Sequence, residues 1–90
     1  MRITFDPAKN ARNVDERDLP FELVSLLDWE TAVSVEDTRK DYGERRLRVL
    51  AFLGERLHAA VITMRDDAMH VISFRKANKK EVRRYEEQRG

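Results

Sequence analysis

The 90-residue sequence has no cysteine, two histidines, two prolines and three glycines. The lack of cysteine excludes a disulfide framework and a thiolate zinc site. His58 and His70 alone leave little for a metal centre or a histidine-based acid–base pair. No apolar run approaches the roughly 20 residues of a membrane helix, and no basic-then-apolar leader opens the chain. We therefore expect one cytoplasmic domain over residues 1–90, with no metal, no other cofactor and no membrane partner.

Charge is abundant but unevenly distributed along the chain. Residues 1–44 carry six Lys/Arg and eleven Asp/Glu, whereas residues 45–90 carry twelve and six, for a net charge of +1. From Arg75 to Arg84 there are six basic residues and one acid, Glu81. Such an asymmetry indicates a surface that binds a polyanion, although two halves that neutralise each other in the fold would have the same composition.

Hydrophobic periodicity predicts an α+β protein: a small antiparallel β-sheet with two N-terminal helices and one C-terminal helix. Asp6 before Pro7 is typical of a helix start, and Asn78 with Glu81 predicts a capping arrangement for the last helix. The predicted strands cover residues 2–5, 31–36, 45–52, 56–64 and 69–74, and the predicted helices cover residues 7–15, 21–27 and 79–89.

Two strand arginines are candidate phosphate ligands. Strand alternation points Thr63 and Arg65 to one side of their strand, and Ser73 and Arg75 to one side of theirs. Whether the two pairs share a face depends on the hairpin register, which the sequence leaves open. A planar guanidinium binds phosphate in a bidentate way and keeps its proton. The alternative is that each arginine is a solvated or salt-bridged surface residue.

The last predicted helix carries like charges at helical spacing. Lys79 and Arg83 share one face, and so do Lys80 and Arg84, so each pair destabilises the helix slightly. A role in binding would explain this cost, whereas partial offset by Glu87 would fit a solvated face. Both interpretations remain open at this point.

Three further features have ordinary structural explanations. Tyr85 follows Val82 at helical spacing, which favours a core position, although its hydroxyl could act as a donor. His70 has a side chain suited to proton transfer, but a lone strand histidine is more often structural. Asp37 and Glu44 could form a carboxylate pair of a hydrolase; we favour salt bridges to Arg39 and Arg45, the simpler account of this loop.

Taken in order along the chain, these residues resemble the BrnT family of bacterial type II toxins. The strongest departure is at Glu16-Arg17-Asp18, where the family usually has Lys-His-Gly. The motifs that carry the resemblance are Phe5-Asp6-x-Ala8-Lys9 with Asn13, Phe21-Glu22, Asp37-x-Arg39-x-x-Tyr42-Gly43-Glu44-x-Arg46, Gly54-x-x-Leu57, Thr63-x-Arg65, Ile72-Ser73-x-Arg75-Lys76-Ala77 and Glu81-x-x-x-Tyr85-Glu86.

The resemblance implies a RelE-like fold and a metal-independent endoribonuclease that cleaves mRNA and so inhibits translation. It also implies a BrnA-type antitoxin as partner, whose ribbon-helix-helix part provides the only, indirect, link to DNA. The alternative is a catalytically decayed relative that only binds RNA or the antitoxin.

The roles suggested by the resemblance are as follows. Arg65 and Arg75 would bind the scissile phosphate, and Tyr85 would assist the leaving group. Either Lys9 or Lys76 would add charge or act as a base of lowered pKa. The flanking RNA backbone would be held by Lys76, Lys79 and Arg83.

Overall fold

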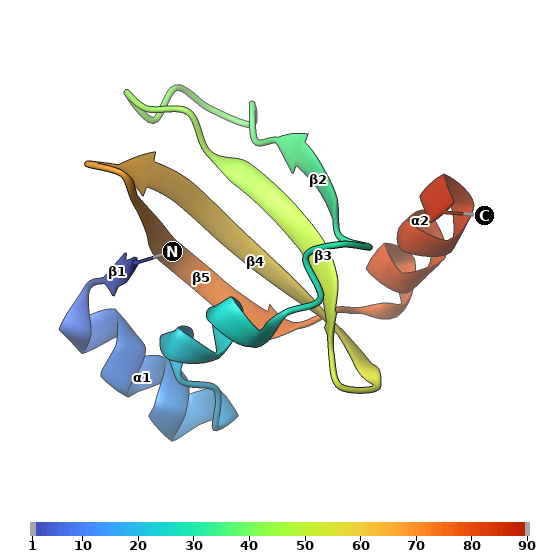
Figure 1. Ribbon diagram of the computed structural model, residues 1–90, viewed down its shortest axis with the longest axis horizontal. Helices are drawn as coiled ribbons and strands as arrows, with labels where there is room; N and C mark the ends of the chain where they lie inside the picture. Colours follow the sequence, from blue (N-terminus) through green and yellow to red (C-terminus); the bar gives the residue numbers. More distant parts are fainter. Residues whose placement is uncertain (1, 90) are drawn as a thin grey trace.

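The structure, a computed structural model, describes residues 2–89 and has an α+β fold, as predicted. Figure 1 shows one sheet with η1 crossing in front of its lower part, α1 below it on the side of β1, and α2 at the far end. The elements are β1 (Ile3–Phe5), α1 (Pro7–Arg17), η1 (Phe21–Leu26), β2 (Val33–Glu36), β3 (Leu47–Leu53), β4 (Arg56–Arg65), β5 (Ala68–Lys76) and α2 (Lys79–Arg89).

The five strands form one mixed sheet in the order β1-β5-β4-β3-β2, so the prediction of an antiparallel sheet is wrong in one respect. Strands β2 to β5 pair antiparallel, whereas β1 pairs parallel with β5, with Ile3 beside Met69. The reason is that β1 continues into α1 instead of a tight hairpin turn. A tight hairpin turn joins only antiparallel strands, whereas the long segment between β1 and β5 also allows the parallel direction.

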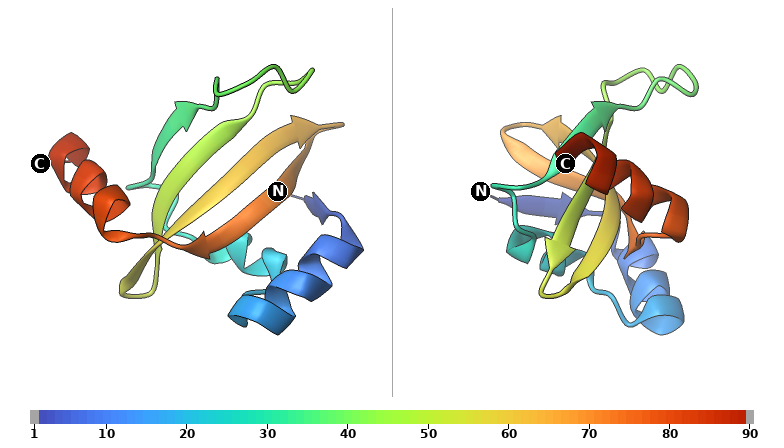
Figure 2. Two further views of the ribbon diagram at one scale, coloured as in Figure 1. Left: turned by 180° about the vertical axis from the view of Figure 1, so that it is seen from behind. Right: turned by 90° about the vertical axis from the view of Figure 1, so that its right-hand side faces the viewer.

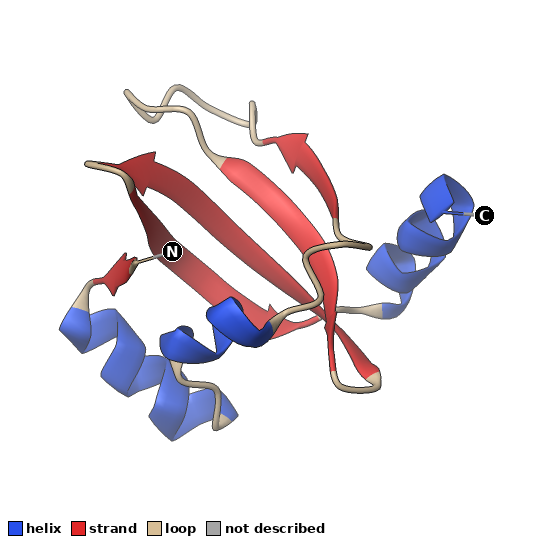
Figure 3. Cartoon of the chain, in the orientation of Figure 1, coloured by secondary structure: helices blue, strands red, loops and turns tan. Residues whose placement is uncertain are grey.

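The N-terminal helices also differ in detail from the prediction. Helix α1 starts as predicted, with the Asp6 carboxylate accepting from the amides of Ala8 and Lys9, but it runs to Arg17. The second helix, η1, is a 3₁₀ helix of six residues between Pro20 and Leu27. Six residues is long for a 3₁₀ helix, whose hydrogen-bond geometry usually limits it to three or four residues. Figure 3 shows both helices lying against the strands.

Alternation along β3 divides the apolar residues between two clusters on opposite faces of the sheet. Val49 and Ala51 join the larger cluster, which contains Phe21 and Val24 of η1. Leu50 joins the smaller cluster beneath α2, whose members are Leu50, Leu57, Ala77 and Tyr85. The two further views in Figure 2 show α2 well away from α1 and η1. The face next to α2 is therefore only partly covered, and it carries the candidate site.

One buried side chain, Asn13, joins α1 to the sheet. Its amide nitrogen donates to the carbonyl of Leu19 (2.8 Å) and to the carbonyl of Phe74 (2.9 Å), while its oxygen accepts from Arg17 (2.9 Å). A buried amide is tolerated only when its hydrogen bonds are made, and here they are made on both sides. Within the departing segment Glu16-Arg17-Asp18, Arg17 thus has a structural contact.

Replacing Asp18 by glycine is expected to stabilise the fold by about 0.5–1 kcal/mol. Asp18 ends α1 with φ 57°, in the left-handed region that glycine adopts without a Cβ clash. A negative charge at a helix C-terminus is also unfavourable. Urea denaturation would measure the change. Asp15→Gly, the same substitution inside α1, is the control and should cost roughly 0.3 kcal/mol, the difference in helix propensity between Asp and Gly. If both variants lost stability equally, the strain assigned to Asp18 would be refuted.

Candidate functional site

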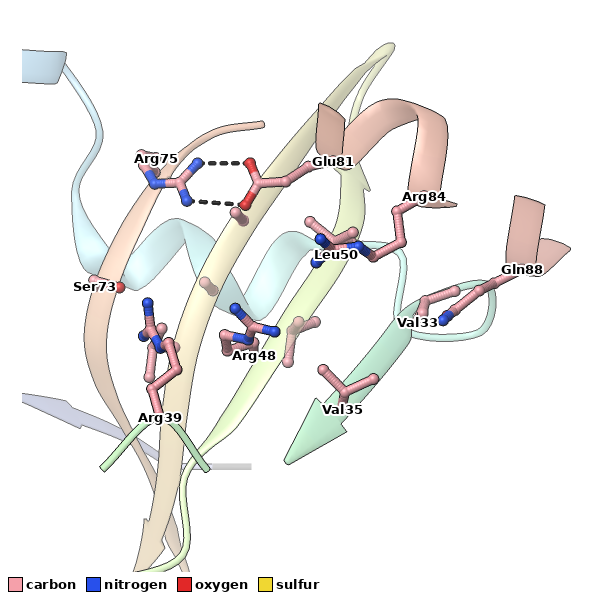
Figure 4. A pocket seen from close by; sticks show the side chains of 14 residues that line it. Val33, Val35, Arg39, Arg48, Leu50, Ser73, Arg75, Glu81, Arg84 and Gln88 are labelled. Carbon is pink, nitrogen blue, oxygen red and sulfur yellow. Dashed lines mark hydrogen bonds and ion pairs between the residues drawn. The ribbon is translucent and has the colours of Figure 1, made fainter. Parts of the chain in front are cut away.

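Four arginine side chains gather over the uncovered part of the sheet, above a floor of small and apolar residues (Figure 4). We call this cavity of about 200 Å³ the arginine pocket. Its floor includes Val33, Val35, Leu50, Ala59 and Val61, and its polar residues are Arg39, Arg48, Ser73, Arg75, Glu81, Arg84 and Gln88.

Four different parts of the chain supply these arginines. Arg48 is in β3 and Arg75 is in β5, the two strands on either side of β4. Ala59 of β4 pairs with Arg75, and its small side chain leaves the floor of the pocket open. Arg84 comes from α2 and Arg39 from the loop that follows β2. The pocket is therefore a product of the tertiary fold.

Arg75 is held in a bidentate ion pair with Glu81, the dashed pair in Figure 4. Its two terminal nitrogens donate to the two carboxylate oxygens at 2.7 and 2.9 Å. Glu81 also accepts from the backbone amide of Asn78, whose side chain accepts from the amide of Glu81, so the predicted capping arrangement is confirmed. Hydrogen bonding to Arg75 lowers the pKa of Glu81. The ion pair thus joins the end of β5 to the first turn of α2.

Arg39 is also paired with a carboxylate at the edge of the pocket. Its guanidinium donates twice to Asp37, both at 2.8 Å, and Tyr42 adds a third hydrogen bond at 3.3 Å. These bonds from Arg39 hold the pKa of Asp37 well below its usual range. The expected salt bridge between Asp37 and Arg39 is thereby confirmed, and it fixes the loop that brings Arg39 to the pocket.

Arg48 and Arg84 differ from the other two arginines. Among residues 2–89, the ion pairs to carboxylates include neither of them. Figure 4 shows both guanidinium groups directed into the pocket, Arg48 from strand β3 and Arg84 from helix α2. Two positive groups without a carboxylate partner, close to a third in Arg75, leave this pocket with an unbalanced positive charge. Such a site favours an anion, and planar guanidinium groups fit phosphate well.

A second polar cluster lies at the other end of β4. Arg65 donates to both oxygens of Glu44, at 3.1 and 2.8 Å. Nearby, His70 is hydrogen-bonded to Thr4 (2.9 Å). Burial lowers the pKa of His70, and the charges of Arg65 and Lys9 lower it further. Lys9, Arg65 and His70 therefore lie in one neighbourhood.

The structure separates the two arginines that the sequence suggested for one phosphate. Arg75 is opposite Ala59, whereas Arg65 is six residues further along β4. At a rise of about 3.3 Å per residue the two backbone positions are about 20 Å apart. Alternation places both on the same side of the sheet. They can thus contact one RNA strand, but at different phosphates.

The remaining candidates surround α2. The Tyr85 hydroxyl donates to the carbonyl of Thr31 (3.0 Å), and its ring packs edge-on against Phe52. Lys79 and Arg83 line a shallow depression with Arg56. Lys76 is exposed at the end of β5, next to Arg75. Lys79 and Arg83 extend the positive surface beyond the arginine pocket, whereas alternation places Lys76 on the opposite face of the sheet from Arg75.

Sequence reasoning did not select Arg39, Arg48 and Arg84, which the structure brings to the pocket beside Arg75. A signal existed for Arg48, because alternation along its strand sets it on the side away from Val49. The prediction for Glu44 was wrong in its partner: Glu44 binds Arg65 and Arg46, whereas Arg45 pairs with Glu36.

Between residues 2 and 89 there is no group of three His, Asp or Glu side chains placed to hold a metal ion. No helix in this part of the chain is long and apolar enough to cross a membrane.

Thermal stability is expected to fall as the pH drops below about 4.5, the ordinary pKa of glutamate. Hydrogen bonds from Arg65 lower the pKa of Glu44 in the folded state, and those from Arg75 lower the pKa of Glu81. The unfolded state therefore takes up protons first, and the stability from both pairs is lost as the pH falls through the lowered values. Melting curves between pH 7 and pH 2 would test this.

The matched variants are Glu44→Gln and Glu87→Gln. Glu44→Gln should lower the melting temperature at pH 7 and flatten its dependence on pH. Glu87→Gln removes an exposed carboxylate of α2 and should leave the curve unchanged. An unchanged pH dependence in Glu44→Gln would contradict the assigned role of its ion pair.

Comparison with known proteins gave one match. A family model described as "Ribonuclease toxin, BrnT, of type II toxin-antitoxin system" matches residues 5–81, which is most of the chain. The matched range includes Arg39, Arg48 and Arg75 of the arginine pocket and ends before Arg84. No curated protein matches the sequence.

Proposed function

Since this chain belongs to the BrnT family, the ribonuclease toxins of type II toxin–antitoxin systems, we propose that it cleaves RNA at the arginine pocket. The family implies an RNA substrate and an antitoxin partner. We further propose mRNA as the substrate, inhibition of translation in the cytoplasm as the effect, a RelE-like fold and a BrnA-type antitoxin.

One observation carries the assignment to this pocket. Arg48 and Arg84 direct guanidinium groups into it without a carboxylate partner among residues 2–89, beside the Arg75 fork. A phosphate bound here would supply the negative charge that Arg48 and Arg84 lack, and its oxygens would replace the Glu81 carboxylate as the partner of Arg75. Arginine forks placed before the reaction stabilise the extra negative charge of a phosphorane-like transition state without reorganisation.

The proposed reaction is a metal-independent transesterification. The ribose 2′-oxygen attacks the adjacent phosphorus, the bond to the 5′-oxygen breaks, and the products are a 2′,3′-cyclic phosphate and a 5′-hydroxyl end. One proton must leave the 2′-hydroxyl and one must reach the departing 5′-oxygen. DNA lacks the 2′-hydroxyl and should not be cleaved.

We assign the removal of the 2′-hydroxyl proton to Glu81. Among the groups that line the pocket, its carboxylate is the one able to act as a base near neutral pH. Its pKa is lowered because Arg75 donates to it. When a phosphate takes over the Arg75 fork, that hydrogen bonding ends and the pKa rises towards its ordinary value. Substrate binding would then strengthen the base that the reaction needs.

The other candidate residues receive roles that fit their positions. Lys9 and Arg65 would hold the RNA backbone on one side of the cut, and Lys79 and Arg83 on the other. Lys76 receives no role at the cut, because alternation places it on the opposite face of the sheet from Arg75. Tyr85 would have to release the carbonyl of Thr31 to protonate a leaving group, so we propose a packing role for it.

Inducible expression in a bacterium tests the proposal, with growth and total RNA followed together. We expect arrested growth and RNA fragments with 5′-hydroxyl ends, and neither in the double variant Arg48→Ala/Arg84→Ala. Purified protein should cleave RNA equally well in EDTA. RNA binding without a cyclic-phosphate product would favour the decayed binding module and would direct attention to Glu16-Arg17-Asp18.

A further inference from the structure

An exposed apolar surface lies on the opposite face of the sheet from the arginine pocket. Ile3 pairs with Met69, and Met69 with Met64, so these side chains form a row across β1, β5 and β4 on one side of the sheet. Ile3 and Met69 also line a groove with Ser25 and Trp29. We call these five residues the apolar patch.

The apolar patch is more exposed to solvent than apolar side chains usually are. Met64 is 51% exposed and Trp29 37%, and Leu26, next to Ser25 on η1, is 66% exposed. Single exposed apolar residues are common, but a connected group around a groove marks an interaction surface. Methionine is frequent on such surfaces because its side chain adapts to the partner.

The dimensions of the patch fit one helix. In Figure 1, η1 crosses the lower part of the sheet, and β4 and β5 continue above it without a helix in front of them. The row from Ile3 to Met64 covers three neighbouring strands, about 10 Å at the usual strand spacing. An α-helix with its side chains is about 10–12 Å across. A third helix would thus complete the layer that α1 and η1 begin.

The charge around the patch is acidic. In a 3₁₀ helix side chains three apart are eclipsed, so Glu22 lies on the same side of η1 as Ser25. Two basic residues adjoin the row in sequence, Arg2 and Arg65. Arg2 donates to the carbonyl of Asp66, and Arg65 points to the other face of the sheet, where it pairs with Glu44. The carboxylates adjoining patch residues in the chain or on η1 are Glu22, Asp28, Glu30, Asp66 and Asp67. This rim would repel RNA and would attract basic side chains.

We infer that the apolar patch binds a basic amphipathic helix of the antitoxin, with apolar residues on one side and Lys or Arg at the borders. Helix binding in an apolar groove is a common mode of recognition, and complementary charges orient the helix. The chain would then bind its two partners on opposite faces, RNA on the basic face and the antitoxin on the acidic one. Because the faces are separate, this inference does not depend on cleavage at the arginine pocket.

Trp29 allows a direct test, because it is the one tryptophan in the sequence. Two synthetic 18-residue helical peptides with the same leucine pattern, one with lysine and one with glutamate at the polar positions, would be titrated while Trp29 fluorescence is recorded. The variants are Met64→Lys, in the patch, and Val35→Lys, which introduces the same charge at another exposed strand residue, on the arginine-pocket face of the sheet. RNA cleavage by both variants would be measured separately.

The expected result is saturable binding of the lysine peptide, at least tenfold weaker in Met64→Lys and unchanged in Val35→Lys, with RNA cleavage by Met64→Lys intact. Equal binding to Met64→Lys would overturn the inference. So would a preference for the glutamate peptide, which would indicate an acidic antitoxin segment in the arginine pocket. Absence of peptide binding, with self-association abolished by Met64→Lys, would assign the patch to a second copy of this chain.

Discussion

Replacing Arg48 by alanine is expected to lower the rate of RNA cleavage about 100- to 1000-fold, the usual effect of removing one transition-state donor. Arg48 points into the arginine pocket and has no carboxylate partner among residues 2–89, so its charge is available to the substrate. For the same reason its loss breaks no ion pair of the fold. The unfolding free energy should therefore change by less than about 1 kcal/mol.

The matched control is Arg45→Ala, three positions earlier in the chain. Arg45 is exposed and paired with Glu36, so this variant should cleave RNA normally. Cleavage would be measured with an RNA oligonucleotide, and binding with its non-cleavable 2′-deoxy analogue over a series of salt concentrations. If Arg48 contacts a phosphate, the salt dependence of binding should weaken by about 0.7 in the logarithmic slope. Equal activity of the two variants would place the active site elsewhere.

The parts of this fold that depend on neighbouring residues could be predicted from the sequence. The start of α1 at Asp6 and the reciprocal cap of Asn78 and Glu81 use groups within three residues of each other. Alternation along β3 placed Val49 and Leu50 on opposite faces, because strand side chains alternate wherever the strand lies. These rules need no knowledge of the rest of the chain.

The sheet order and the pocket could not be obtained in this way. The parallel pairing of β1 with β5 joins residues more than 60 positions apart. The register of β4 and β5 changes at a bulge between Val61 and Ile62, and no local signal marked it. Arg39 reaches the site because Asp37 fixes its loop. The sequence therefore singled out Arg75, which lines the pocket, as a candidate phosphate ligand, but it could not single out the arginines that surround it.

For the same reason the sequence indicates only a helix-capping role for Glu81, because its pairing with Arg75 depends on the tertiary fold. From the sequence it is the residue three after Asn78. In the structure it also closes the Arg75 fork inside the pocket, so one carboxylate serves the helix and occupies the place proposed for phosphate. A substitution that keeps the cap but removes the charge separates these two roles.

Replacing Glu81 by glutamine is expected to strengthen RNA binding several-fold while it lowers cleavage at least 100-fold. Glutamine is accepted at this position of a capping box, so α2 should remain in place. Without the carboxylate, the Arg75 fork is free for phosphate, and affinity for the 2′-deoxy analogue should rise. The 2′-hydroxyl proton would then have no acceptor, and loss of a general base typically costs 100- to 10,000-fold.

Glu87→Gln, which removes an exposed carboxylate from the same helix, should alter neither quantity. The opposite directions of the two effects are what make Glu81→Gln decisive. If Glu81 only positioned α2, binding and cleavage would fall together. If another residue were the base, cleavage would stay normal or rise with the improved binding. Tighter binding with slower cleavage is expected only if Glu81 competes with phosphate for Arg75 and also accepts the proton.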